Sequence, residues 1–415
     1  MLMKTQEDAP EEQEGDGVAR TGGGPPWLLL IVIGSLPVFI LLMTDISDLR
    51  AGGILSTGHI WGRDFVNAWT GGRLVVEGRL GTLYDLNAYV AYLHQVVGPL
   101  KPHYYSYPPS SLFLVAPLGL LPYFAALALW LIGTLALFLW AARPYAREVK
   151  GFPLAIAALT PAATVNIWAG HYGFLIGALW LACFSRIATA PVRSGALAAL
   201  MTIKPHLGLL LPPVLLARRA WTVIAVATGG AIALVLASGW LFGFQLWRDY
   251  FVKMSQVQAG LLEDQHSFFL SMMPGTFTMV HSTIRVPDGP AWILQGCAAL
   301  AALFLCWRAW RAGASNRDLA FVGATATFLI LPYGFNYDMT VVSLGFALLL
   351  ARHWARLGGW NRWLLIGGFL SPQTTFLSGV IGLPLTPLIL LAALAAQVRL
   401  CGPEWRNQAE EPEQH

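Results

Sequence analysis

The chain has 415 residues, of which 56% are hydrophobic and 12% are charged, with a mean hydropathy of +0.58. A soluble globular chain carries roughly 25% charged residues, so this composition excludes a soluble globular fold and indicates a helical membrane protein. The formal net charge of +4 is small, and the basic residues lie in short loops between apolar segments, which argues against a nucleic-acid-binding surface.

Two polar tails flank the apolar part of the chain. Residues 1–26 are acidic and glycine-rich and lack the basic segment that opens a cleavable signal peptide. Their composition predicts a disordered cytoplasmic tail, and residues 403–415 resemble them. We therefore expect a single transmembrane domain over residues 27–402.

The first apolar run, Trp27–Met43, approaches the length of about 20 residues that a membrane-crossing helix needs. The longest hydrophilic stretch follows at 44–107 and forms the first of two large loops. Apolar residues at helical spacing predict two amphipathic helices within it, beginning near Phe65 and Leu86 and lying against the membrane surface. Asp85 is suited to cap the second of these helices.

Further apolar segments predict an all-α polytopic membrane protein with about 11–13 membrane segments. Residues 194–217 differ from the others, because two half-length apolar runs flank Lys204-Pro205-His206 and basic residues stand at both outer ends. This pattern predicts a hairpin with Lys204 and His206 at its tip. The second large loop is expected at 244–290. The remaining predicted segments are 110–121 (a half-length helix), 123–142, 152–168, 172–188, 221–243, 291–307, 319–335, 339–351, 362–380 and 383–399.

The distribution of lysine and arginine predicts the orientation of these segments. Loops on the side of the N-terminus contain 17 basic residues and loops on the opposite side contain 8, with Lys204 left over at membrane depth. Because cytoplasmic loops are the more basic, both termini are expected in the cytoplasm and both large loops outside. Nucleotide sugars are not normally available there, so a sugar donor at that face would have to be carried by a lipid.

Asp64, within Trp61-Gly-Arg-Asp-Phe-Val-Asn-Ala-Trp69, stands directly before the first predicted loop helix. One interpretation is an N-cap for that helix, since aspartate is a favoured capping residue. The other is a carboxylate that performs chemistry on a lipid-borne substrate. The two are compatible, because a carboxylate at a helix N-terminus keeps a fixed direction and stays ionised.

Lys204 and His206 are the second pair of candidates. An ionisable residue at membrane depth is energetically costly and by default marks a functional site. A broken hairpin can line a polar cavity, where a cation would bind a phosphate and stabilise negative charge as it leaves. The alternative is a lysine that extends from a surface loop.

Four further residues are weaker candidates, because a helix cap explains one of them as well as a site role does, and structural histidines and an interfacial aromatic side chain explain the others better. The four cysteines have no zinc-ligand or disulfide spacing, and the chain contains no Walker-type loop and no His-Glu-x-x-His motif. No cofactor is therefore expected, although the sequence leaves a divalent metal open. The four weaker candidates are Tyr107, His171, His266 and Asp338.

Several short motifs resemble glycosyltransferase family 87, and together they cover most of residues 27–400. One departure is Gly170-His171, where the family often has Gly-Gln. The resemblance implies a fold of the GT-C superfamily, whose enzymes use polyprenyl-phosphate sugars; the best-known activity is an α-1,2-mannosyltransferase of bacterial glycolipid synthesis. The motifs are Asp64-Phe65, Gly71-Gly-Arg-Leu74, Glu77-Gly78, Leu83-Tyr-Asp85, Tyr105-Ser-Tyr-Pro-Pro109, Ala116-Pro-Leu-Gly-Leu-Leu-Pro122, Lys204-Pro205 and Asn336-Tyr-Asp338.

Carried over to this chain, the resemblance implies that Asp64 is the catalytic base of an inverting displacement. Lys204, with His206, would bind the phosphate of the donor. The implied partners are a polyprenyl-phosphate sugar donor, a glycolipid or glycan acceptor and membrane lipids, with no nucleic acid, in a bacterial inner membrane. The residues implied to contact sugar or acceptor are Tyr107, His171, His266 and Asp338.

Two other function classes suit parts of the sequence. A transporter or flippase for a lipid-linked solute would also use an intramembrane lysine and broken helices. It would have little need for two surface helices behind a fixed carboxylate, and the sequence has no inverted repeat. A non-catalytic subunit of an envelope assembly is the third class, and it predicts that Asp64 is dispensable.

Overall fold

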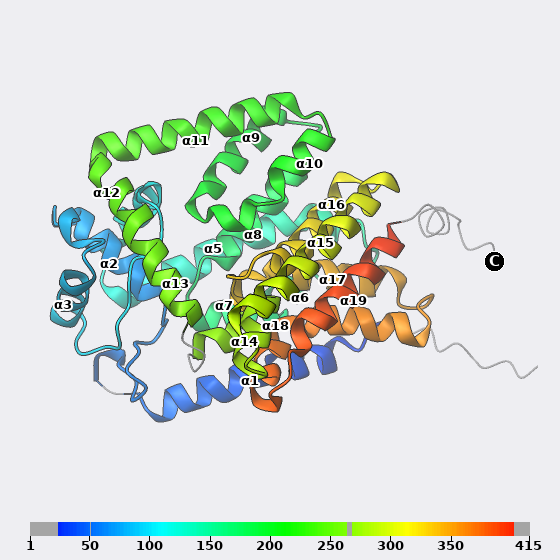
Figure 1. The fold of residues 1–415 in the computed structure, drawn as a ribbon, viewed down its shortest axis with the longest axis horizontal. Helices are drawn as coiled ribbons and strands as arrows, with labels where there is room; N and C mark the ends of the chain where they lie inside the picture. Colours follow the sequence, from blue (N-terminus) through cyan, green and yellow to red (C-terminus); the bar gives the residue numbers. More distant parts are fainter. Residues whose placement is uncertain (1–23, 50, 264–267, 402–415) are drawn as a thin grey trace, which may run out of the picture.

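The computed structural model describes residues 24–49, 51–263 and 268–401 (Figure 1). Across these ranges the chain forms helices and no β-strand, with one isolated bridge between Ile54 and Ile60. The helices are α1 (Trp27–Ser47), α2 (Phe65–Val76), α3 (Leu86–Val96), α4 (Leu112–Val115), α5 (Tyr123–Ala146), α6 (Ala155–Ala158), α7 (Pro161–Ala169), α8 (Gly173–Phe184), α9 (Pro191–Leu200), α10 (Leu211–Ala217), α11 (Trp221–Phe242), α12 (Phe244–Asp249), α13 (Ser255–Glu263), α14 (Thr276–Thr283), α15 (Asp288–Arg311), α16 (Asn316–Ile330), α17 (Thr340–His353), α18 (Gly359–Ile381) and α19 (Leu385–Leu400).

Within the described part of the chain, five helices are long and apolar enough to cross a membrane, namely α1, α5, α11, α15 and α18. Six shorter apolar segments accompany them, so the prediction of an all-α polytopic membrane protein is confirmed. The predicted span at 152–168 is broken at Thr160-Pro161, where the Thr160 hydroxyl accepts a hydrogen bond from the amide of Ala163 and starts the short helix α7. Proline at the first position of a helix favours such a start.

The two predicted helices of the first loop are confirmed as α2 and α3. Asp85 caps α3 as expected, and its carboxylate accepts a hydrogen bond of 2.9 Å from the amide of Ala88. Helix α2 differs from the expectation of a surface helix, because most of its side chains are buried against the short 3-10 helix Ala116–Leu120. Gly72 and Gly119 permit this packing, since a Cβ on either would overlap the backbone of the other segment.

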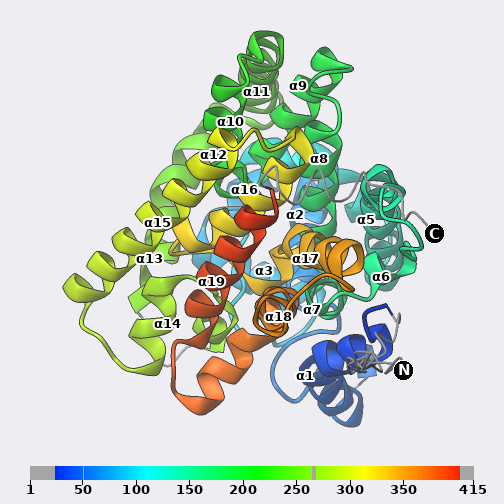
Figure 2. The same ribbon diagram turned by 90° about the vertical axis from the view of Figure 1, so that its right-hand side faces the viewer.

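The predicted hairpin is also confirmed. Helices α9 and α10 are short and enclose Lys204, which stands between two turns of 3-10 helix. Helix α9 packs along α11, and the hairpin lies beside α11 in both views (Figures 1 and 2). Because each helix is half the length of a membrane span, the hairpin tip lies within the depth of the bundle.

The predicted second loop, 244–290, is largely helical. Helix α12 continues through a π-helical turn, Tyr250–Met254, into α13, and these helices run diagonally from the end of α11 towards α14 (Figure 1). Leu246 and Met254 are buried against the core while Phe251 is exposed. The sequence did not predict these helices, because charged residues interrupt the apolar run, although one face still packs onto the protein.

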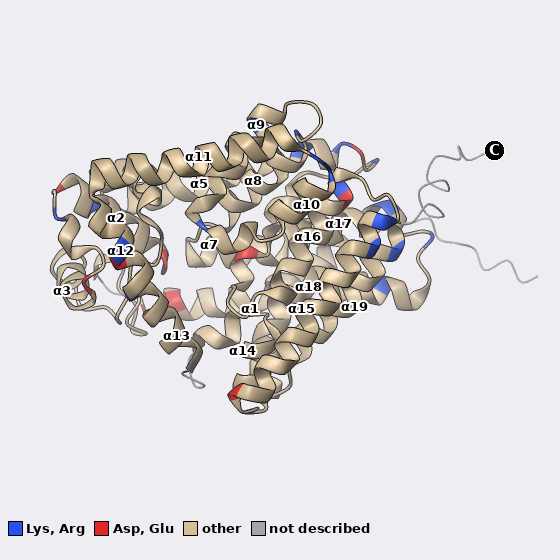
Figure 3. Ribbon diagram, turned by 45° about the horizontal axis from the view of Figure 1, so that its top comes forward, with Lys and Arg blue, Asp and Glu red and all other residues tan. Residues whose placement is uncertain are grey.

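Basic residues gather at one end of the bundle, as the sequence pattern predicts (Figure 3). Arg317 pairs with Glu148, and the Arg218 guanidinium donates a hydrogen bond to the carbonyl of Ala314. These contacts bring three connecting segments together at that end. Lys204 takes no part in the cluster, because its partner is Asp338.

Candidate active site

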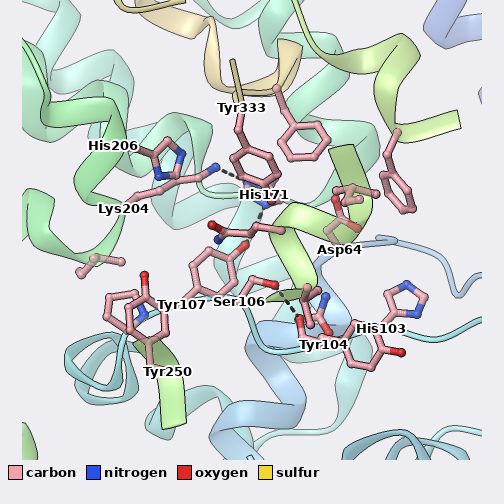
Figure 4. Close-up of a pocket in the computed structure, with 18 of the residues that line it drawn as sticks. Asp64, His103, Tyr104, Ser106, Tyr107, His171, Lys204, His206, Tyr250 and Tyr333 are labelled. Carbon is pink, nitrogen blue, oxygen red and sulfur yellow. Dashed lines mark hydrogen bonds between the residues drawn. The ribbon is translucent and has the colours of Figure 1, made fainter. Parts of the chain in front are cut away.

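A cavity of about 340 Å³ lies where the start of α2, the hairpin tip and α13 converge (Figure 4). In this view Lys204 and His206 lie to one side of His171, and Asp64 and His103 lie to the other. The residues that line the cavity are Asp64, Asn67, Pro102, His103, Tyr104, Ser106, Tyr107, Pro108, His171, Ile203, Lys204, Pro205, His206, Tyr250, Val257, Gln258, Gly260, Leu261, Phe269, Tyr333, Phe335 and Tyr337.

The backbone of Asp64 is attached to the end of α7. Its amide donates a hydrogen bond of 3.1 Å to the carbonyl of Ala169. Gly170 then ends α7 in the left-handed conformation, with φ of 64°. A Cβ at Gly170 would lie 2.5 Å from the carbonyl oxygen of Gly62, so only glycine lets the two segments approach this closely. The carboxylate is therefore fixed relative to the link between α7 and α8.

The interpretation of Asp64 as a helix cap is wrong. Asp64 stands at the N-cap position of α2, but its backbone is already helical and its side chain accepts no hydrogen bond from the helix. Its carboxylate faces the cavity (Figure 4). Burial raises the pKa of this carboxyl group above its ordinary value, and positive charge on His103, Arg63 and Lys204 opposes that shift. A carboxylate with a raised pKa is a stronger base than ordinary aspartate.

Asp45 and Arg63 support this position, and the sequence interpretation overlooked both. Arg63, directly before Asp64, has a positive φ of 42°. Its guanidinium donates hydrogen bonds of 2.6 and 3.3 Å to the Asp45 carboxylate at the end of α1. The Trp168 indole donates to the same carboxylate at 2.9 Å and lies under the guanidinium at 4.1 Å. The sequence signal that could have identified this pair is Asp45, a carboxylate near the end of an apolar segment.

Lys204 is buried at the other side of the cavity. Its ammonium lies 2.5 Å from Oδ2 of Asp338 and 3.3 Å from Nδ1 of His171. Only 6% of the side chain is exposed, so the alternative of a lysine extending from a surface loop is wrong. The ammonium also lies 5.3 Å from the centre of the Tyr337 ring. Lys204 thus presents a desolvated cation beside the cavity.

The remaining candidates differ in whether they line the cavity. Tyr107 and His171 line the cavity and are joined by a hydrogen bond of 2.8 Å between the hydroxyl and Nε2. Asp338 does not line it: its side chain is fully buried behind Lys204, in the 3-10 helix Asn336–Asp338, and makes an ion pair instead of a helix cap. His206 lines the cavity, and its Nε2 has no hydrogen-bond partner in the described part of the chain. His266 lies outside the described residues.

His103 and Asn67 were not singled out in the sequence, yet both line the cavity. The carbonyl of Lys101 lies 2.7 Å from Nδ1 of His103, and a carbonyl only accepts, so Nδ1 carries the hydrogen. Nε2 of His103 is buried and has no partner among the described residues. The Asn67 carbonyl oxygen accepts from the Tyr89 hydroxyl at 3.2 Å. A lone histidine and asparagine in a loop gave no signal in the sequence.

The described ranges contain no group of three or more His, Cys, Asp or Glu side chains that could bind a metal ion. Chemically, the cavity offers a carboxylate that makes no hydrogen bond to the described residues, a buried ammonium, and several further donors and acceptors. A hydroxyl could lose its proton at the carboxylate, and an anion could bind at the ammonium. This arrangement suits a group transfer with a negatively charged leaving group.

Comparison with known proteins agrees with this chemistry. No curated protein and no solved structure matched the chain. The model of glycosyltransferase family 87 matches residues 105–332, more than half of the chain. The matched region includes Tyr107, His171, Lys204 and His206. Asp64 precedes the matched region in sequence but lines the same cavity as these residues. The chain belongs to glycosyltransferase family 87 and is a membrane glycosyltransferase.

Proposed function

We propose that the protein transfers a hexose, such as mannose, from a polyprenyl-phosphate donor to a glycolipid or polysaccharide acceptor. The observation that supports this most directly is the cavity itself, in which the Asp64 carboxylate and the buried Lys204 ammonium line one space. Family membership supplies the reaction class, and the two charged groups supply the polarity that such a transfer requires.

The reaction is a single displacement. The acceptor hydroxyl gives its proton to Asp64 as its oxygen forms a bond to the anomeric carbon. The bond between that carbon and the phosphate oxygen breaks at the same time, and its electron pair leaves with the phosphate. Attack opposite to the leaving group inverts the anomeric configuration, through a transition state that resembles an oxocarbenium ion.

The leaving group needs no general acid, because a phosphate ester is stable as an anion. Lys204 binds the phosphate and stabilises the charge that develops on it, and His206 lines the same side of the cavity. The ion pair of Lys204 with Asp338 fixes the ammonium in place before the donor arrives. At the opposite side, Nε2 of His103 and the side-chain amide of Asn67 are available to sugar hydroxyls.

We place the reaction at the outer face of a bacterial inner membrane, with both termini in the cytoplasm. The gathering of basic residues at one end of the bundle supports this orientation, because cytoplasmic loops are the more basic (Figure 3). A lipid-linked donor suits that compartment, since it carries an activated sugar across the membrane. Apolar helices around the cavity would contact the isoprenoid chain.

The test is sugar transfer by purified protein in detergent, with radiolabelled mannose on a short-chain polyprenyl phosphate and membrane lipids as acceptors. Asp64→Asn keeps the shape of the side chain but removes the base, so kcat should fall by about 10²–10⁴-fold. Asp85→Asn is the matched control, because Asp85 caps α3 outside the cavity and asparagine caps equally well.

Two results would overturn parts of the proposal. Transfer by a folded Asp64→Asn variant at the wild-type rate would remove Asp64 from the chemistry. Transfer from a nucleotide sugar, without transfer from any polyprenyl-phosphate sugar, would refute the donor class. Replacing mannose by glucose or galactose on the same lipid carrier then identifies the preferred hexose.

A further inference from the structure

Four polar groups form a continuous chain from the interior of the protein to the cavity. The Asp338 carboxylate lies 2.5 Å from the Lys204 ammonium, which lies 3.3 Å from Nδ1 of His171. Nε2 on the far side of the same imidazole lies 2.8 Å from the Tyr107 hydroxyl. Lys204, His171 and Tyr107 line the cavity (Figure 4), whereas Asp338 does not line it and its side chain is fully buried.

The chemistry of these groups determines which atom donates at each link. An ammonium only donates, so Nδ1 of His171 must accept the hydrogen bond from Lys204. A neutral imidazole then carries its hydrogen on Nε2, which donates to the Tyr107 oxygen. Burial and the positive charge of Lys204 hold the pKa of His171 well below its ordinary value, in agreement with a neutral ring. The opposite tautomer would direct an N–H at the ammonium.

The direction of these hydrogen bonds leaves the hydroxyl hydrogen of Tyr107 without an assigned partner. The Tyr107 oxygen accepts from His171, so its own O–H bond points elsewhere. Burial raises the pKa of Tyr107 well above its ordinary value, so the hydroxyl keeps its hydrogen. The ring is fixed against Tyr172, with ring centres 4.3 Å apart. The side chain is thus a preoriented donor at the wall of the cavity.

We propose that Tyr107 donates a hydrogen bond to the phosphate of the lipid-linked donor, and that His171 is the positioning residue that directs this hydroxyl. The proposal rests on the proposed function, and it moves Tyr107 from the sugar contacts to the phosphate site. Lys204 then has two roles. It contacts the phosphate directly, and through His171 it polarises Tyr107, which also contacts the phosphate.

This arrangement stabilises the leaving group in a particular way. Charge on the phosphate increases as its bond to the anomeric carbon breaks, so a fixed donor binds the transition state more strongly than the ground state. The loss of one such donor from a preorganised site lowers kcat by about 10²-fold. Binding of the free polyprenyl phosphate, which carries more negative charge than the esterified donor, should weaken by about tenfold.

The test compares Tyr107→Phe, His171→Leu and His171→Gln in transfer assays and in titrations with a short-chain polyprenyl phosphate. Tyr107→Phe keeps the ring and should lower both kcat and lipid-phosphate affinity. His171→Leu should have a similar effect, while His171→Gln recovers most of the loss, because an amide supplies an acceptor and a donor. Tyr145→Phe is the matched control, since its buried hydroxyl donates to the Leu181 carbonyl and neither residue lines the cavity.

A double variant, Tyr107→Phe with His171→Leu, adds a readout that a purely structural role would not change. If His171 acts through Tyr107, the double variant is no worse than Tyr107→Phe alone. Additive losses, or wild-type kinetics for Tyr107→Phe, would overturn the proposal. Tyr107→Phe decides the matter even if His171→Leu fails to fold. Failure of wild-type protein to bind any polyprenyl phosphate would instead refute the donor class of the proposed function.

Discussion

Asp45 and Arg63 form a bidentate ion pair, with distances of 2.6 and 3.3 Å, directly beside the backbone of Asp64. The pair connects α1 to the loop that carries the catalytic candidate. Arg63 has a positive φ, which is unfavourable for residues other than glycine, so the surrounding contacts must hold the backbone in this conformation. Helix α1 is otherwise poorly buried, and this ion pair gives it a role in the site.

Asp45→Asn should therefore lower kcat without changing the affinity for polyprenyl phosphate. The loop would relax around Arg63, and a displacement of about 1 Å at a catalytic group can lower the rate by about 10²-fold. Kinetic assays and lipid-phosphate titration of the same preparation measure the two effects. Asp48→Asn is the control, because Asp48 lies one turn further along and pairs only with Ser56 among the contacts described. Weaker lipid-phosphate binding by Asp45→Asn would contradict this role.

The ion pair between Lys204 and Asp338 predicts a strong dependence of folding on both partners. Removing one charge leaves the other buried and unpaired, which destabilises a protein by about 3–5 kcal/mol. Asp338→Asn and Lys204→Met should each lower the midpoint of thermal unfolding in detergent. The double variant should be more stable than the sum of the two effects predicts, because neither charge remains. Additive effects would show that the pair contributes little.

The raised pKa of Asp64 predicts the pH dependence of the reaction. Catalysis needs the ionised carboxylate, so kcat/KM should fall as the pH falls through this raised pKa. The acidic limb of the profile should therefore lie above about pH 3.9, the ordinary value for aspartate. The residual activity of Asp64→Asn should lack this limb. A wild-type profile that is flat down to pH 4 would contradict the assignment.

The same shift predicts an effect on stability. A carboxyl group whose pKa is higher in the folded state than in the unfolded state favours folding most when it is protonated. Its ionisation therefore lowers the free energy of unfolding as the pH rises from the unfolded pKa to the folded pKa. At neutral pH, Asp64→Asn should raise the melting temperature. Asp85→Asn, which replaces a carboxylate engaged in a cap, should not. A lower melting temperature for Asp64→Asn would mean that the carboxylate stabilises the fold.

The sequence predicted the order of helices well, because hydropathy and helical spacing are local properties that each segment carries itself. It also identified Asp64 and Lys204, which stand out as charges beside apolar runs. It could not identify Arg63 or His103 as site residues. Their roles depend on contacts between distant segments, such as that of Trp168 with Asp45, which are 123 positions apart. Nor could it separate a cap from a free carboxylate at Asp64, because both interpretations use the same residue type at the same position.

The contact between Gly72 and Gly119 positions α2, so an added methyl group should disrupt the site from a distance. A Cβ on Gly119 would overlap the backbone of α2, which neither segment can avoid without moving. Gly119→Ala should destabilise the protein by about 3 kcal/mol, the upper part of the usual range for overpacking, and should lower transfer activity. Gly133→Ala in α5 is the control, because open space surrounds that position. Equal stability of the two variants would refute this packing.

The proposed orientation predicts which residues a membrane-impermeant maleimide can reach. Gly81 is exposed between α2 and α3, in the first large loop, and Lys150 is exposed after α5 at the basic end of the bundle. The native cysteines would first be replaced by alanine, since Cys297 is exposed. In intact spheroplasts, Gly81→Cys should be labelled, and Lys150→Cys should be labelled only after permeabilisation, because the positive-inside rule assigns the basic loops to the cytoplasm. The reverse pattern would place the cavity at the cytoplasmic face, where soluble nucleotide sugars are available, and a lipid-linked donor would no longer be required.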